Sequence, residues 1–265
     1  MQTLEDFVHS NIDVNNQQKQ TNWVMKTIVD KYQYTENTYF IEIFLYVVLD
    51  KLRKQGFING IHIYSVLLND NIYKIKMERA RNNLENYMIN TKNLHEVEKK
   101  SIVFQIFASI VEINKLFHFV HNDLHTRNVV YFETSEKFIH YNINNQLYIV
   151  PTFGKIFKII DFGNSIVQYE NINYISGAFS MIGCYKNIDI SKVLDCENSC
   201  ILINIIHFLR NFSIIHNDNS VFVNFIYENQ GNLTYIFQNN DIDIKYLYNN
   251  IHKYSYNMNY FNCFV

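Results

Sequence analysis

The most informative stretch of the sequence is His121-Asn122-Asp123-Leu124-His125-Thr126-Arg127-Asn128. It follows a long apolar-periodic segment and precedes a run typical of a strand, so we expect it to form a loop. Asp123 and Asn128 lie five residues apart on that loop. One short oxygen ligand can orient an attacking hydroxyl and accept its proton, while the other holds a magnesium ion. The spacing therefore indicates a phosphoryl-transfer site.

A second stretch, Asp161-Phe162-Gly163, comes directly after the apolar run from Lys155 to Ile160. An acid that emerges from the end of an apolar strand, followed by an aromatic residue and a glycine, is well placed to bind a metal ion. Asp161 is therefore a candidate metal ligand beside Asn128.

Taken together, the two stretches resemble the protein-kinase superfamily. His121-Asn122-Asp123 with Asn128 is similar to its catalytic loop H-R-D-x-x-x-x-N, with asparagine in place of arginine, and Asp161-Phe162-Gly163 matches its D-F-G. The resemblance implies ATP and Mg²⁺ as cofactors, Asp123 as catalytic base, His121 as a further catalytic residue, and Asn128 and Asp161 as metal ligands. The implied reaction transfers the γ-phosphoryl group to a hydroxyl, that of Ser or Thr in a protein substrate.

The family also has a strand lysine that contacts the ATP phosphates and a helix glutamate that braces it. Trp23-Val24-Met25-Lys26 resembles that strand, and Glu42 lies sixteen residues after Lys26 on a predicted helix. An acid in the middle of an apolar helix needs a partner when it faces inward. The alternatives are that both side chains are exposed to solvent, or that Glu36 is the partner of Lys26.

Three more residues enter the expected ATP site through the resemblance. Met77-Glu78-Arg79-Ala80 falls where the family has its hinge, so the backbone groups of Glu78 and Ala80 are expected to bind adenine. His125 occupies the place of a lysine in Ser/Thr kinases, and we expect it to contact phosphate; the alternative is a loop histidine bonded to backbone. His-Asn-Asp-Leu-His is also similar to kinases of the aminoglycoside and choline type, which keeps a small-molecule acceptor as an alternative substrate.

Hydrophobic periodicity and turn residues predict an α+β chain. The expected strands cover residues 21–29, 61–68, 72–77, 129–132, 138–142, 146–150 and 155–160. The expected helices run from residue 35 or 37 to 54, from 84, over 96–119, over 199–209 and over 244–252.

With the resemblance, this order implies a two-lobed protein-kinase-like fold. Residues 1–20 are polar and are expected to form a loop or frayed segment, residues 21–80 a reduced N-lobe, and residues 81–265 a C-lobe with a short C-terminal region. The interval between Asn128 and Asp161 is long, and we expect a hairpin insert near residues 134–154 that turns at Asn144-Asn145. Such an insert is similar to that of kinase-like proteins of large DNA viruses.

The sequence also departs from the family pattern. No Gly-x-Gly-x-x-Gly loop precedes Lys26, and no Ala-Pro-Glu follows Asp161. That glycine loop normally covers the phosphates, so its absence predicts weaker or more exposed ATP binding. It also motivates a different class of function, a pseudokinase that binds nucleotide or a partner without catalysis. Asp195 is expected to be a buried acid that braces the catalytic loop.

Composition excludes several classes of protein. The 265 residues are 48% apolar and 18% charged with a net charge of -2, which opposes disorder and lacks the basic excess of a nucleic-acid binder. A largely apolar segment, residues 102–120, contains Gln105, Glu112 and Lys115 and is too polar to span a bilayer. We therefore expect a soluble intracellular protein with no nucleic-acid or membrane partner, located in the cytoplasm, or in the host cytoplasm or virion if the protein is viral.

The cysteines predict no metal site. They lack the paired spacing of a zinc centre, and the expected state is that of reduced thiols. The four residues are Cys184, Cys196, Cys200 and Cys263.

Overall fold

The computed structural model describes residues 23–29, 37–69, 72–91, 94–175, 194, 196–216 and 259–265. Several sequence predictions fall on residues outside these ranges. They are the loop over residues 1–20, the helix over 244–252, and the roles of Glu36, Cys184 and Asp195.

The first three strands of the sequence form an antiparallel sheet. It consists of β1 (Trp23–Val29), β2 (Ile63–Asn69) and β3 (Ile72–Glu78) in the order β1-β3-β2. These bounds agree with the predicted strands to within two residues. The register places Lys26 of β1 opposite Ile75 of β3.

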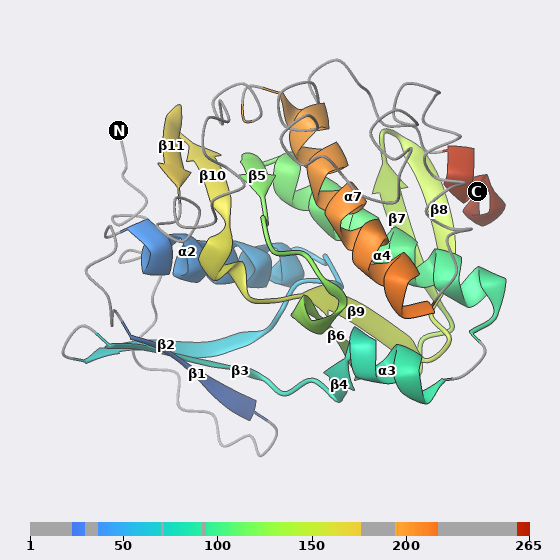
Figure 1. The fold of residues 1–265 in the computed structure, drawn as a ribbon, viewed down its shortest axis with the longest axis horizontal. Helices are drawn as coiled ribbons and strands as arrows, with labels where there is room; N and C mark the ends of the chain where they lie inside the picture. Colours follow the sequence, from blue (N-terminus) through green and yellow to red (C-terminus); the bar gives the residue numbers. More distant parts are fainter. Residues whose placement is uncertain are drawn as a thin grey trace.

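Helix α2 (Asn37–Lys54) lies between this sheet and the strands β10 (Ile166–Tyr169) and β11 (Ile172–Ile175) (Figure 1). Every residue of α2 from Phe40 to Asp50 is buried. The helix is therefore enclosed on more than one face, and the acid Glu42 in its first half is buried together with its apolar neighbours.

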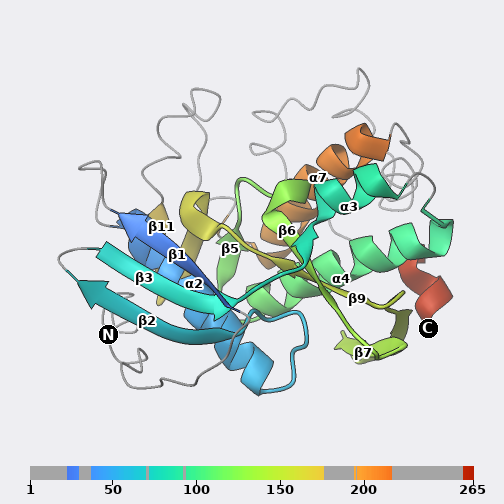
Figure 2. The same ribbon diagram turned by 90° about the horizontal axis from the view of Figure 1, so that it is seen from below.

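Three helices form the other side of the molecule. They are α3 (Leu84–Asn90), α4 (Glu96–Asn114) and α7 (Glu197–His216), and α4 and α7 pack against each other (Figures 1 and 2). Helix α7 extends two residues before and seven after the predicted 199–209. A last 3-10 helix, η5 (Asn259–Phe264), contacts the centre of α4 through Phe264 and Phe104.

The predicted helix over residues 96–119 is wrong at its C-terminal end. Helix α4 stops at Asn114, and His118–Val120 forms the strand β5, which pairs with β10. Asn114 explains the stop, because its amide Nδ2 donates to the Ile110 carbonyl and its Oδ1 accepts from the Phe119 amide. The Asn114 side chain thus caps the end of α4 and also holds the backbone of β5, which follows it.

Short strands surround the loops that carry the predicted site. Strand β6 (Val129–Glu133) lies between β4 (Asn82–Asn83) and β9 (Lys155–Ile159), and β10 lies between β5 and β11. The strands β6 and β9 follow the prediction, whereas β5, β10 and β11 were not predicted. The combination of these small sheets with helices makes the chain an α+β protein.

The strands β7 (Phe138–Ile143) and β8 (Gln146–Pro151) form a separate hairpin. Its turn is the predicted Asn144-Asn145, whose φ angles are 54° and 63°. Two consecutive left-handed residues make a tight hairpin turn, and asparagine tolerates this conformation better than most residues. The inner face of the hairpin packs on α4, where Phe104 contacts Tyr141 and Tyr148.

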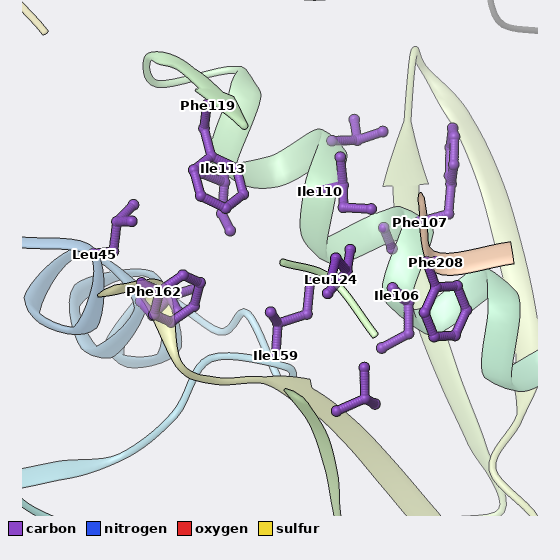
Figure 3. Close-up of a cluster of buried hydrophobic side chains, with 14 of the residues drawn as sticks. Leu45, Ile106, Phe107, Ile110, Ile113, Phe119, Leu124, Ile159, Phe162 and Phe208 are labelled. Atoms are coloured by element: carbon purple, nitrogen blue, oxygen red, sulfur yellow. The ribbon is translucent and has the colours of Figure 1, made fainter. Parts of the chain in front are cut away.

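The hydrophobic core is continuous from α2 to α7. Figure 3 shows Phe162 near Leu45 of α2, with Ile159 and Leu124 beyond it and Phe208 of α7 farther away. Burying a phenylalanine side chain stabilises the fold by about 1.5–3 kcal/mol, so these rings contribute substantially. Among the described helices, none combines the length and hydropathy needed to cross a membrane.

Candidate active site

The two loops singled out in the sequence lie beside each other because strand pairing fixes both of their ends. The first loop runs from β5 to β6, and the second runs from β9 to β10. Strand β5 pairs with β10 at Val120 and Ile166, while β6 pairs with β9 at Val129 and Ile159. The Ile160 amide also donates to the Asn128 carbonyl at 2.9 Å. Residues 121–128 and 160–165 are therefore brought together by the topology.

Asp123 lies on the first loop with its carboxylate partly exposed, at 40% of its side-chain surface. Asn128 is buried, and its Nδ2 donates to the Asp123 carbonyl at 2.9 Å. This bond leaves the amide oxygen of Asn128 as the atom suited to a cation. The Asp123 carboxylate itself accepts a hydrogen bond from Asn164 at 3.1 Å and lies 3.6 Å from His125 Nε2.

Asp161 begins the second loop in a left-handed conformation, with φ 66° and ψ 67°. A non-glycine residue in this region costs roughly 1–2 kcal/mol, and such residues concentrate at functional sites. The surrounding structure holds it there, because the Asp161 amide donates to the Tyr46 hydroxyl at 3.0 Å. The Asp161 side chain remains 52% exposed.

Lys26 joins this loop to α2. Its Nζ forms ion pairs with Glu42 and with Asp161, the latter at 2.6 Å. Burial alone would lower the pKa of Lys26, but the influence of Tyr46, Glu42 and Asp161 outweighs it and raises that pKa. Burial raises the pKa of Glu42, and the Lys26 ammonium opposes this shift. The inward Glu42 thus depends on Lys26 for its charge, and the alternative that both side chains are exposed is wrong.

His121 supports the first loop from inside. It has no exposed surface, its ring packs on Phe162 at 5.2 Å between centroids, and its Nε2 lies 3.0 Å from the Ile160 carbonyl. Burial lowers its pKa to about 4, so the imidazole is neutral at pH 7. The buried ring thus supports the loop from the interior, and a catalytic role for His121 stays a prediction from the resemblance.

The predicted hinge residues lie between β3 and β4. The Glu78 amide already donates to the His62 carbonyl at 3.0 Å, so the carbonyl of Glu78 is the backbone group to consider for adenine. Its side chain binds Lys158 Nζ at 2.5 Å and the His62 amide at 2.7 Å. Ala80 is half-buried in the connecting segment. His125 is also half-buried, which agrees with either of its expected roles.

Sequence reasoning missed three residues that the structure places at this site: Tyr46, Lys158 and Asn164. Tyr46 lies four residues after Glu42, and that helical spacing puts both on one face, so this residue was detectable. Asn164 directly follows Asp161-Phe162-Gly163. Lys158 carried no signal, because a lysine in a predicted strand is ordinarily exposed.

A magnesium ion of the type bound with nucleotides fits the polar groups present. Within the described ranges, no group of three or more His, Cys, Asp or Glu side chains is arranged to hold a metal ion. Magnesium in nucleotide sites uses one or two carboxylates and takes its other ligands from phosphates and water. The Asp161 carboxylate and the Asn128 amide oxygen meet this smaller requirement.

Comparison with known proteins gives a partial match. Over 73 residues, 28% of this chain, the sequence is 40% identical to the serine/threonine-protein kinase haspin of Bos taurus. Over the same length it is 37% identical to haspin of Mus musculus. The matched stretch spans only about a tenth of these relatives, 9% and 10% of their lengths. No protein-family model matches the chain. Part of the chain is thus similar to a protein kinase.

Proposed function

We propose that this chain is a protein-kinase-like phosphotransferase that transfers the γ-phosphoryl group of ATP to Ser or Thr of a protein substrate. The observation that carries the proposal is the meeting of Lys26, Glu42 and Asp161 beside the loop of Asp123. These residues come from β1, α2 and two separate loops. The partial similarity to haspin supports a protein acceptor.

Each residue then has a distinct role. Lys26 binds the ATP phosphates and Glu42 holds it in place, while Asp123 orients the acceptor hydroxyl and takes its proton. Asp161 and Asn128 would hold magnesium, which when bound neutralises charge on the phosphates. The protein contributes mainly position and charge, because phosphoryl transfer requires little covalent chemistry from the enzyme.

The remaining assignments belong to the same proposal. The first sheet with α2 corresponds to a reduced N-lobe over residues 21–80, and the rest to a C-lobe over 81–265 with an inserted hairpin near 134–154. Glu78 and Ala80 bind adenine through their backbone, and His125 contacts phosphate. The viral resemblance and the cytoplasmic location stay predictions from the sequence alone.

The second candidate function is a pseudokinase, and one observation favours it. Residues 1–25, which precede Lys26, contain no glycine, whereas the family has a glycine-rich loop before this lysine to cover the phosphates. Such a protein would bind nucleotide or a partner through the same residues without turnover. A small-molecule kinase is the remaining alternative, which His125 motivates.

One assay separates these functions. The purified chain is incubated with Mg²⁺ and ATP labelled on the γ-phosphate, together with generic protein substrates or with a panel of aminoglycosides and choline. We expect label on Ser or Thr of protein. Label on small molecules alone would contradict the protein-kinase proposal. Binding of Mg-ATP in a thermal-shift titration without any transfer would establish the pseudokinase instead.

A further inference from the structure

The loop that carries Asp161 also reaches the proposed catalytic base. Asn164 lies in the 3-10 helix η2 (Phe162–Asn164), and its Nδ2 donates to Asp123 Oδ2 at 3.1 Å. We propose that Asn164 is a positioning residue for Asp123. This inference rests on the proposed function and adds to it a residue that sets the orientation of the base.

The chemistry of the two side chains supports this role. The two oxygens of an aspartate exchange by rotation about a broad, two-fold torsion, so a free carboxylate does not present one fixed oxygen. A donor attached to Oδ2 selects one orientation and leaves Oδ1, which lies 3.6 Å from His125 Nε2, for the acceptor hydroxyl. The amide nitrogen of Asn164 donates only, so it cannot compete for the proton that Asp123 must take.

Asn164 is itself held in place from two directions. The side-chain Nδ2 of Asn122 donates to the backbone carbonyl of Asn164 at 3.3 Å, and the backbone N–H of Ser165 donates to the Phe162 carbonyl at 3.0 Å. Phe162 is fully buried, so it anchors this short helix in the core.

Asn122 can make this contact because of its backbone. Its φ is 62°, a left-handed conformation that asparagine accepts more readily than most residues. Asn122 stands where the related catalytic loops have arginine. In this chain two uncharged side-chain amides therefore connect the loop of residues 121–128 with that of residues 160–165. Asn122 donates a hydrogen bond to Asn164, and Asn164 donates one to Asp123.

The test compares Asn164→Ala with the wild-type protein and with Asn142→Ala, a matched control on the exposed face of the hairpin. A lost hydrogen bond to a charged group predicts that kcat of Asn164→Ala falls by about 10- to 100-fold. The KM for ATP and the melting temperature should stay near wild type, because Asn164 is not proposed to touch nucleotide. Asn142→Ala should leave all three unchanged.

A double-mutant cycle distinguishes positioning from a general structural role. If Asn164 acts through Asp123, then Asn164→Ala should have almost no further effect in a protein that already carries Asp123→Asn. Independent, multiplying losses would overturn the inference, as would a kcat of Asn164→Ala within twofold of wild type. Absence of transfer by the wild-type protein would overturn the proposed function and this inference with it. Normal wild-type turnover with an unaffected Asn164→Ala would overturn the inference alone.

Discussion

Lys26 is the residue on which two carboxylates of the site depend. Its ammonium lies between Glu42, which is buried, and Asp161, which is partly exposed. A buried acid without a partner would lose its charge or destabilise the fold. Lys26 is proposed to bind the nucleotide, and Asp123 is proposed to act on the acceptor hydroxyl. Variants of the two residues should therefore change ATP affinity and turnover differently.

Asp123→Asn should leave the affinity for ATP nearly unchanged and slow turnover by about 10²–10⁴, the usual range for a positioned acid–base group. Lys26→Ala should weaken ATP binding as well as turnover, because Lys26 is proposed to contact the phosphates both before and during transfer. ATP titration and initial rates measure both effects. Lys74→Ala, on an exposed position of β3, is the control. Equal turnover by Asp123→Asn and wild type would refute the assignment of the base.

Asp161→Asn should abolish the Mg²⁺-dependent part of nucleotide binding and leave the fold intact. The amide keeps the size of the carboxylate but lacks the charge that a hard cation requires. Thermal shift with ATP, in the presence of Mg²⁺ or of a chelator, measures this difference directly. A variant that still gains stability from Mg-ATP as wild type does would exclude Asp161 as the metal ligand.

His121 gives the fold a dependence on acid pH. Burial holds its pKa at about 4 in the folded protein, below the ordinary 6.5 that it regains on unfolding, while Asp123 and Asp161 oppose the shift. Between these pH values the unfolded chain binds more protons, so the free energy of unfolding falls as the pH drops from about 6.5 towards 4. Urea unfolding of wild type and His121→Gln at pH 7 and pH 5 should show a smaller loss in the variant. An equal loss in both proteins would mean that His121 does not contribute.

At the scale of elements, the sequence predicts the helices and turns that a local residue pattern determines. It does not predict the strands that form only by pairing with a distant part of the chain. The periodicity of α2 and the asparagine turn of the hairpin are local, and both were predicted. The strand His118–Val120 was not, because its apolar residues Phe119 and Val120 continue the pattern of α4 and become part of a strand only by pairing with β10. Within the site, contiguous motifs predicted Asp123, Asn128 and Asp161. Asn164 and Lys158 contact residues far away in the sequence, and sequence spacing does not show such contacts.

The hairpin of β7 and β8 is joined to the loop after α2 by one buried bond. The Tyr141 hydroxyl donates to Asn59 Oδ1 at 2.6 Å, and Asn59 Nδ2 donates to the Phe157 carbonyl at 2.7 Å. Tyr141→Phe should lower the free energy of unfolding by about 1–3 kcal/mol, since it leaves a buried acceptor unsatisfied. Tyr148→Phe is the matched control, because its hydroxyl bonds the exposed Gln146. Urea unfolding compares the two, and equal losses would contradict the prediction.

At the scale of the whole molecule, side chains near the segment 79–81 connect the first sheet to the strands that carry the site. Glu78 at the end of β3 binds Lys158 of β9, and Lys158 Nζ also lies 4.5 Å from the ring of Phe132. The Lys158 side chain is 7% exposed and that of Glu78 is 19% exposed. Burial lowers the pKa of Lys158, and Glu78 opposes this shift. This ion pair links β3 to β9, and the link requires both the Glu78 carboxylate and the Lys158 ammonium.

Removing one member of this pair should cost more than removing both. Glu78→Gln leaves a buried ammonium without its counter-charge, and breaking buried ion pairs in this way costs about 3–5 kcal/mol. Replacing both, as Glu78→Gln with Lys158→Met, removes the unpaired charge and should recover much of that loss, because methionine fills a similar volume. The free energies of unfolding of the two single variants and the double variant form a cycle that measures the coupling. Simple addition of the two single losses would show that the pair does not hold β3 and β9 together.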